Sequence, residues 1–260
     1  MPEPVALITG ASSGIGTELA RVFARHGHRL VLAARRADRL EALAGEIARS
    51  GSPRPLVIGV DLSRTDGGDR IEAALADAGV EPQFVVNNAG FGLAGEAASQ
   101  SRSRQLEMID LNVRALTDLS LRFADALERH RGGLMNVASV AAFLPGPNHA
   151  VYYATKAYVL SFTEALHEEW RGRGVRVCAL CPGPVPTEFQ AVAGTGNEVL
   201  DTPMTTFADR VAQEGYAGLM AGRRLVVPGF LNKALVYGSG LLPHAVLLPA
   251  VAKRHGPGPR

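Results

Sequence analysis

The stretch that decides the fold lies near the start of the chain and reads Val5-Ala6-Leu7-Ile8-Thr9-Gly10-Ala11-Ser12-Ser13-Gly14-Ile15-Gly16. Its apolar beginning is typical of a strand buried on both faces of a parallel sheet. The glycines follow at a G-x-x-x-G-x-G spacing and lead into a helical pattern. Strand, turn and helix predict a nucleotide-binding unit, because glycines let the backbone approach a ligand and free N–H groups at a helix start attract phosphate. An ordinary tight turn is the alternative.

The end of the second predicted strand, residues 29–34, distinguishes between two cofactors. In dinucleotide-binding folds an acid in this region accepts the ribose hydroxyls of NAD, whereas an arginine accommodates the 2′-phosphate of NADP. Ala34 and Arg35 occupy it here. Arg35 therefore predicts NADP(H) rather than NAD(H), since a guanidinium binds phosphate and an acid would repel it. In the alternative interpretation Arg35 and Arg36 are two solvated charges that open a helix.

Apolar runs and amphipathic stretches alternate along the chain without an internal linker. Further strands are expected at residues 56–60, 83–86, 133–138, 175–181 and 225–228. Helices are expected at residues 37–49, 67–77, 101–128, 148–166 and 206–220. This alternation predicts one doubly wound α/β domain of the Rossmann type over residues 1–252, with a seven-stranded, mostly parallel sheet. An irregular stretch at about 184–205 is expected to be a substrate loop.

Polar residues follow two of the predicted strands at their carboxyl ends. Asp61 and Leu62 come after the third strand, and Asn88-Ala89-Gly90 come after the fourth. Ligands of open parallel sheets bind at this edge, so Asp61 is expected near an adenine and Asn88 to Gly90 near a ribose. Helix caps or turns are the commoner use of Asp and Asn and remain the alternative.

A tyrosine and a lysine lie one helical turn apart at Tyr152 and Lys156. Side chains four residues apart are neighbours on a helix, and a nearby cation lowers the pKa of a phenol. The pair therefore predicts a tyrosine that exchanges protons, although a partly buried ring beside a solvated charge would give the same spacing. Tyr153 is a rival, because residues three apart also meet. Asn112 lies inside the long predicted helix, where spacing alone favours an exposed side chain.

The two cysteines, Cys178 and Cys181, form a C-x-x-C within an apolar strand. A separation of three puts their side chains on opposite faces, and no second cysteine pair completes a zinc site. We expect inert core thiols and no metal.

Composition excludes some classes of partner. The chain has 260 residues, 47% of them hydrophobic, and its 27 basic and 25 acidic residues are spread along the sequence. No basic block interleaved with aromatics predicts a nucleic-acid surface. No secretory leader pattern precedes the first strand, so a cytoplasmic protein is expected.

The apolar segment at residues 230–252 is too short and too interrupted by proline for a membrane-spanning helix. Cover for the substrate site or contact with another subunit is favoured, contact with a membrane surface is left open, and no membrane partner is predicted. The tail 253–260 is expected to be disordered.

In their order along the chain, these motifs resemble the short-chain dehydrogenase/reductase family over about residues 4–230. The resemblance adds Ser139, thirteen residues before Tyr152, and the turn Pro182-Gly183-x-Val185-x-Thr187. It implies that Tyr152 is the general acid, that Lys156 lowers its pKa and binds the nicotinamide ribose, and that Ser139 binds the substrate oxygen. Asn112 is implied to anchor a water that relays protons to Lys156, against the exposed interpretation. The turn residues Pro182, Gly183, Val185 and Thr187 are implied to hold the carboxamide of the cofactor.

The resemblance predicts an NADP(H)-dependent enzyme, most plainly a reductase of a ketone or aldehyde. The expected substrate is hydrophobic, a 3-oxoacyl or lipid-like carbonyl compound, because the loops at the sheet edge are mostly apolar. Oxidation of a secondary alcohol and a cofactor-binding sensor without turnover are the alternatives. The family also implies a homodimer or homotetramer built from the long helix and the helix at residues 148–166.

Overall fold

The computed structural model describes residues 2–195, 202–239 and 244–255. At its centre is a seven-stranded sheet in the order β3-β2-β1-β4-β5-β6-β7, in which every neighbouring pair is parallel. The strands are β1 (Glu3–Thr9), β2 (Leu30–Ala34), β3 (Leu56–Gly59), β4 (Val80–Asn87), β5 (Gly133–Val137), β6 (Arg176–Leu180) and β7 (Leu225–Val226). The strand order changes direction between β1 and β4, which places a binding crevice at their carboxyl ends. The predicted doubly wound fold is confirmed.

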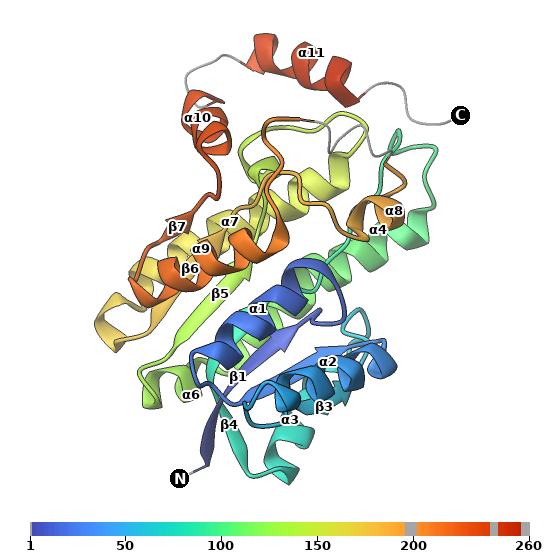
Figure 1. Ribbon diagram of the computed structural model, residues 1–260. Helices are drawn as coiled ribbons and strands as arrows, with labels where there is room; N and C mark the ends of the chain where they lie inside the picture. Colours follow the sequence, from blue (N-terminus) through green and yellow to red (C-terminus); the bar gives the residue numbers. More distant parts are fainter. Residues whose placement is uncertain (1, 196–201, 240–243, 256–260) are drawn as a thin grey trace.

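Helices cover both faces of this sheet (Figure 1). One layer is formed by α1 (Gly14–Arg25), α2 (Ala37–Arg49) and α9 (Ala208–Met220). The other contains α3 (Gly67–Asp77), α5 (Leu116–Arg122), α6 (Ala124–Arg129) and α7 (Ala150–Glu169). In β1 the side chains alternate between the two layers, with Ile8 packed in the first and Leu7 in the second. Burial on both faces explains the uninterrupted apolar runs of the sequence.

The long helix predicted over residues 101–128 is interrupted in the structure. It consists of α4 (Arg102–Ile109), a π-helical turn η1 (Asp110–Ala115), and then α5 and α6. Asn112 lies in the π-helical turn and is only 1% exposed, so the exposed position expected from spacing is wrong. The wider turn lets the Asn112 side chain point inward and form hydrogen bonds, as insertions of this kind often do at functional sites.

The last third of the chain is less regular. A short 3-10 helix η2 (Val140–Phe143) precedes α7, and a second, η3 (Arg171–Arg173), follows it. The expected substrate loop contains α8 (Phe189–Ala193), and its residues 196–201 lie outside the described part. Two helices follow β7, α10 (Phe230–Ser239) and α11 (His244–His255). Helix α11 extends into the tail expected to be disordered from residue 253, while residues 256–260 lie outside the described part.

None of the helices in the described ranges combines the length and the apolar character that crossing a membrane requires.

Candidate active site

The glycine-rich turn between β1 and α1 has no room for side chains. Gly10 and Gly14 have φ angles of 66° and 58°, a conformation that favours glycine. A Cβ atom at Gly16 would lie 2.4 Å from the Asn88 side-chain nitrogen. Ile15 anchors the start of α1 by packing against the core. Because α1 begins here, its free N–H groups lie at the carboxyl edge of the sheet, where a phosphate can approach closely.

Asn88 and Ala89 tie this turn to the end of β4. The Asn88 side chain donates to the carbonyl oxygens of Thr9 (2.9 Å) and Gly10 (3.2 Å). Thr9 Oγ1 in turn accepts from the backbone N–H groups of Asn88 (3.0 Å) and Ala89 (3.1 Å). The Asn88 side chain therefore shapes the turn, so contact with a ribose would fall to the backbone of this segment.

Asp61 and Leu62 lie at the end of β3, on the same edge. Asp61 Oδ1 accepts hydrogen bonds from the Ser63 backbone N–H (3.0 Å) and hydroxyl (2.7 Å). Burial raises the pKa of Asp61, but these hydrogen bonds outweigh that effect and leave the pKa below its ordinary value. Leu62 is buried in the core. Asp61 thus serves as a turn residue while its position remains that of the predicted adenine contact.

The arginine nearest the glycine turn is Arg36 and not Arg35. The Arg36 guanidinium donates to Ser13 Oγ (2.9 Å) and to Ser12 Oγ (3.2 Å). Arg35 points to the other side, where its Nη1 lies 3.6 Å from Glu107 Oε1 and its side chain is 58% exposed. Both arginines follow the second strand in the sequence, so either could have been the phosphate ligand. Which of them points towards the glycine turn depends on tertiary contacts. Arg36 is a site residue that sequence reasoning did not select.

Glu188 connects the segment after β6 to the start of α2. Its carboxylate accepts hydrogen bonds from Arg36 (2.7 Å) and from Arg39, which come from the start of α2. The hydrogen bonds from Arg39 and Arg36 lower the pKa of Glu188 to about 2. An acid from the segment after β6 therefore holds the arginines beside the phosphate-binding turn.

Asn112 joins three elements at the centre of the edge. Its side chain donates to the Phe91 carbonyl oxygen (2.9 Å) and to Thr155 Oγ1 (3.1 Å), and accepts from the Phe91 N–H (3.1 Å). A Cβ atom at Gly90 would lie 2.9 Å from Asn112 Oδ1 and 3.6 Å from Lys156 Nζ. Asn112, Gly90 and Lys156 therefore meet at one point, although their sequence positions are far apart.

Ser139, Tyr152 and Lys156 lie together beside this point. The Ser139 side chain is close enough to Tyr152 to lower the pKa of its phenol, and Ser139 Oγ accepts a hydrogen bond from the Ala141 N–H (3.1 Å). Lys156 Nζ donates to the Val137 carbonyl oxygen at the end of β5 (2.8 Å) and lies 5.9 Å from the centre of the Tyr152 ring. The structure thus brings together the serine, tyrosine and lysine that the sequence predicted.

The pKa values of these groups differ from the sequence expectation. Burial raises the pKa of Tyr152, and the hydrogen bond with Ser139 only partly opposes this effect. Burial lowers the pKa of Lys156 to about 8. Lys156 was expected to lower the pKa of Tyr152. In the structure the effect of burial on this pKa is the larger one, so the phenol stays protonated.

Tyr153 occupies a different environment from Tyr152. Its ring packs on the loop before α7, where a Cβ atom at Gly146 would lie 2.3 Å from it. It also lies against the ring of His149, with 6.1 Å between the ring centres. The direction of its side chain therefore separates Tyr153 from Ser139 and Lys156, which makes Tyr152 the better candidate for the acid.

The turn after β6 packs against the glycine-rich turn and against η2. Gly14 and Thr187 are in contact, since a Cβ atom at Gly14 would lie 2.9 Å from Thr187 Cγ2. Pro182 accepts through its carbonyl oxygen from the Val140 N–H (3.0 Å), which joins the turn to η2. Val185 is buried in the core layer of α1 and α9, so only its backbone is available to a ligand.

Asn232 of α10 supports this turn and was not predicted. Its side chain is 1% exposed and packs against Gly183, where a Cβ atom would lie 2.4 Å from Asn232 Oδ1. Its Nδ2 donates to the carbonyl oxygens of Pro228 (2.8 Å) and Met204 (3.0 Å). No local sequence signal marks this residue, because its partners are 4 and 28 residues away in the chain.

Aromatic side chains form one wall beside the phenol. The rings of Phe189 and Tyr152 are 5.5 Å apart, and a Cβ atom at Gly92 would lie 2.8 Å from Phe189 and 3.2 Å from Tyr152. Among the apolar side chains of the loops at the sheet edge, Phe91 and Val185 are buried in the protein and Val192 is exposed. Phe189 therefore supplies apolar surface directly beside Tyr152.

The cysteines lie where the strand pattern placed them. Cys178 packs in the layer of α1 and α9, and Cys181 packs on the other side with residues of α7 and α10. Both are free and buried, and burial raises the pKa of Cys178 to about 12. Within the described ranges, no three His, Cys, Asp or Glu side chains are grouped so that they could hold a metal ion.

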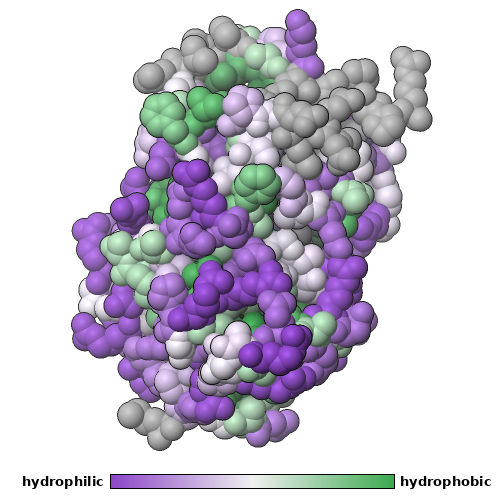
Figure 2. Space-filling view, in the orientation of Figure 1, coloured by the Kyte–Doolittle hydropathy of each residue, from purple (hydrophilic) through white to green (hydrophobic). Residues whose placement is uncertain are grey.

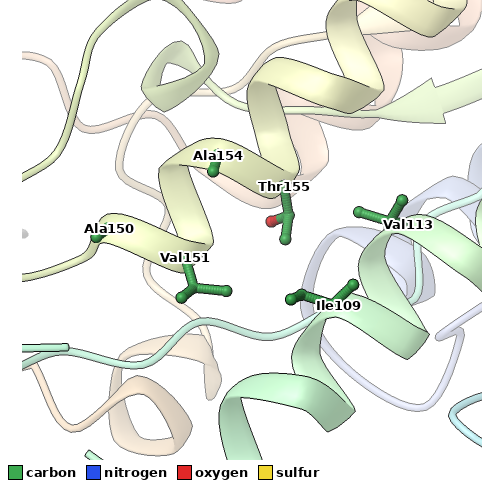
Figure 3. Close-up of a pocket in the computed structure, with 6 residues that line it drawn as sticks. All are labelled: Ile109, Val113, Ala150, Val151, Ala154 and Thr155. Carbon is green, nitrogen blue, oxygen red and sulfur yellow. The ribbon is translucent and has the colours of Figure 1, made fainter. Parts of the chain in front are cut away.

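A separate apolar hollow of about 440 Å³ lies between α7 and the helix formed by α4 and η1. Figure 3 shows the side chains of Val151 and Thr155 turned towards Ile109 and Val113. None of the residues around Tyr152 described above, except Thr155, lines it. The hollow is therefore distinct from the catalytic edge.

Comparison with known proteins agrees with this geometry. The family model described as short chain dehydrogenase matches residues 4–198. Serine 3-dehydrogenase from Agrobacterium fabrum is 36% identical over 193 residues, which cover 74% of this chain and 76% of the relative.

Two solved structures share the fold over nearly the whole chain. A short-chain dehydrogenase from Sphingobium yanoikuyae in complex with NADPH has a TM-score of 0.80 at 32% identity and covers 92% of this chain and 94% of its own. The bulky-bulky ketone specific alcohol dehydrogenase from Comamonas testosteroni has a TM-score of 0.76 at 28% identity, with 93% and 94% covered. With the family model matching most of its length, the chain belongs to the short-chain dehydrogenase/reductase family and is an oxidoreductase that acts on alcohol and carbonyl groups with a nicotinamide cofactor.

Proposed function

We propose that this enzyme reduces a hydrophobic ketone or aldehyde to an alcohol, with NADPH as cofactor and Tyr152 as the general acid. The observation that carries the proposal is the meeting of Ser139, Tyr152 and the buried Lys156 at one edge of the sheet, with the Lys156 ammonium 5.9 Å from the centre of the Tyr152 ring. A nicotinamide dinucleotide fits the crevice, because the glycine turn leaves no Cβ atom in the way and Arg36 supplies a cation beside it.

The proposed roles follow from the positions of the side chains. A nicotinamide cofactor bound at this edge would supply the hydride for the carbonyl carbon. As the C–H bond forms, the Tyr152 hydroxyl gives its proton to the carbonyl oxygen, and the Ser139 hydroxyl donates a hydrogen bond to the same oxygen. The Lys156 ammonium stabilises the phenolate that results, and Asn112 holds the backbone beside Lys156 in place. The alcohol is then the product, and Tyr152 takes up a proton from solvent.

The raised pKa of Tyr152 supports reduction over oxidation. Burial keeps the phenol protonated, which is the form that a carbonyl reduction consumes. Oxidation of an alcohol needs the phenolate as a base and must first overcome this shift. The name of serine 3-dehydrogenase favours the opposite direction for that relative, so oxidation of an alcohol with NADP+ is the second candidate.

The preference for NADPH rests on Arg36 together with the absence of an acid at the end of β2. The Arg36 guanidinium lies at the glycine turn, where it can pair with a phosphate on the adenosine ribose. Arg39 lies beside it through the shared carboxylate of Glu188. We propose that Arg36 takes the role first assigned to Arg35.

The substrate class rests on the surroundings of Tyr152. Phe189 and Phe143 present apolar surface near Tyr152 and Ser139, and the ketone-specific dehydrogenase from Comamonas testosteroni shares the fold. The decisive experiment is a screen of carbonyl compounds that follows NADPH absorbance, with NADH in parallel wells. We expect turnover of bulky apolar ketones or aldehydes and slower turnover with NADH. Turnover of small charged carbonyl compounds alone would overturn the substrate class, and faster rates from alcohols with NADP+ would overturn the direction.

We also propose a homodimer or homotetramer that uses α4, α5 and α7. The hollow of Figure 3 lies between α7 and α4, and these three helices carry exposed apolar side chains, namely those of Leu106, Ile109, Leu121 and Tyr158. An exposed apolar face of this kind is a common subunit interface. Light scattering on the purified enzyme tests it, and replacement of Ile109 by Lys should shift the mass to that of a monomer.

A further inference from the structure

Helix α10 has its aromatic side chains on the solvent side. Phe230 is 82% exposed and Tyr237 is 69% exposed, and their separation of seven residues places them on the same side of the helix. Leu231, also exposed, continues the apolar surface. Figure 2 shows hydrophobic surface at the position that α10 occupies in Figure 1. A water-exposed helix would ordinarily present polar residues here.

The opposite side of α10 is firmly packed, so this orientation is fixed. Asn232, Val236 and Ser239 are buried, and Val236 packs with Val140 and Phe143 at η2. The hydrogen bonds of Asn232 to Pro228 and Met204 hold the start of the helix. Turning Phe230 and Tyr237 inward would expose these residues, so the exposed aromatic side is a stable feature of the fold.

A polar groove of about 360 Å³ runs beside the aromatic surface, between α9, β7 and α10. Arg223, Lys233 and Tyr237 line it, and neither Arg223 nor Lys233 forms an ion pair with any described residue. Glu214 also lines the groove, but its carboxylate is paired with Arg210 (2.9 Å). The side chains of Arg223 and Lys233 are therefore available to bind an anion beside the exposed aromatic rings.

The charge of the whole C-terminal region has one sign. Residues 221–260 hold six basic side chains and no acidic one, although the chain has 27 basic and 25 acidic residues in all. Residues 1–220 accordingly hold 21 basic and 25 acidic side chains. The net positive charge is therefore confined to the part of the chain that carries Phe230 and Tyr237.

We propose that α10 and the adjoining groove form a docking surface for an anionic lipid bilayer. Aromatic side chains prefer the boundary between headgroups and acyl chains, and lysine and arginine beside them are attracted to anionic headgroups. A second copy of this chain fits less well, because a two-fold contact through this face would bring Arg223 and Lys233 close to their own copies. The surface lies outside the catalytic residues, and attachment would bring the enzyme to a membrane without inserting it.

The test is co-sedimentation of the full-length enzyme with vesicles of phosphatidylcholine alone or with about 30 mol % phosphatidylglycerol. We expect binding to the anionic vesicles that is at least about tenfold stronger than to the neutral ones and that weakens in high salt. The double variants Phe230→Ser/Tyr237→Ser and Arg223→Gln/Lys233→Gln should each lose about tenfold in vesicle affinity. Arg49→Gln is the matched control, because Arg49 is exposed in the last turn of α2, beside the edge of the sheet opposite β7, and this variant should bind as the wild type does.

Turnover of a water-soluble carbonyl compound and thermal unfolding should be the same in all variants, which shows that they fold. Wild-type enzyme that ignores anionic vesicles would overturn the proposal. So would vesicle binding that both double variants retain. If light scattering shows a dimer that the double variants dissociate while vesicle binding is unaffected, the surface is a subunit interface and the bilayer proposal fails.

Discussion

The cofactor side of the sheet and the C-terminal helices are held in place in different ways. Around β1, α1 and β4, large apolar side chains such as Phe23 and Leu19 are completely buried, and the glycine turn leaves no space for a Cβ atom. In α10 the largest side chains face outward, and the helix depends on Asn232 and Val236. Apolar packing therefore fixes the cofactor edge, whereas the orientation of α10 depends on a few buried residues and the hydrogen bonds of Asn232.

The largest effect is expected on the tightly packed side, at α7. Replacement of Tyr152 by Phe removes the proton donor and should lower kcat about 10³-fold, with NADPH affinity retained. Tyr153→Phe is the control, since its ring packs on Gly146, and it should keep kcat within about threefold. Steady-state rates with the best carbonyl substrate measure both. A fully active Tyr152→Phe enzyme would remove the basis of the proposed chemistry.

The second prediction concerns the buried ammonium of Lys156. Its pKa in the folded protein is about 8 against an ordinary 10.5, so below pH 8 its burial costs free energy of folding. As pH rises from 8 towards 10.5 the folded lysine is neutral while the unfolded one still binds a proton, so this cost diminishes.

Lys156→Met should therefore be more stable than the wild type at pH 7, by up to about 3 kcal/mol, and should lose this advantage by about pH 10. Urea unfolding of both proteins at several pH values gives the difference directly. A difference that does not change with pH would show that burial does not shift the pKa of Lys156.

The third prediction separates the two adjacent arginines. Arg36→Ala should weaken NADPH binding about 30-fold, and Arg35→Ala only about threefold, because Arg36 alone reaches the glycine turn. Binding of NADH should change little in either variant. Fluorescence titration of the purified proteins provides the dissociation constants.

Glu188→Gln supplies the complementary variant. It removes the carboxylate that pairs with Arg36 and Arg39 and should tighten NADPH binding about threefold. If Arg35→Ala weakens NADPH binding more than Arg36→Ala does, the original assignment of Arg35 was right.

The smallest effect is expected on the C-terminal side. Asn232→Ala removes the hydrogen bonds to Pro228 and Met204 and should lower the free energy of unfolding by about 1–2 kcal/mol. Ala234→Ser, at an exposed position of the same helix, is the control and should be neutral. Thermal unfolding measures both. An Asn232→Ala protein as stable as the wild type would mean that α10 is held by apolar packing and not by this side chain.

Much of the cofactor side could be predicted because its signals are local. The bounds of α2 and α3 agree with the residue spacing, and the glycine turn has the conformation that its sequence requires. The positions of Ser139, Tyr152 and Lys156 at one edge follow from a parallel sheet, in which strand ends meet on the same side.

The remaining features depend on contacts between distant residues. The π-helical turn at Asn112 is stabilised by Phe91 and Thr155, 21 and 43 residues away, so helical spacing alone predicted an exposed side chain. The choice between Arg35 and Arg36, and the support of Gly183 by Asn232, likewise depend on packing. The pKa of Tyr152 is raised because its side chain is buried. The residues adjacent to Tyr152 in the sequence do not indicate that burial.

The positions of the two cysteines give this fold a built-in pair of reporters. Cys178 and Cys181 belong to one strand end, yet each is sealed beneath a different helical layer. A thiol reagent reaches either sulfur only when the layer above it opens. The labelling rate of Cys178 therefore measures how often the layer of α1 and α9 opens, and the labelling rate of Cys181 measures how often the layer of α7 and α10 opens. Both rates can be obtained from the unmodified protein.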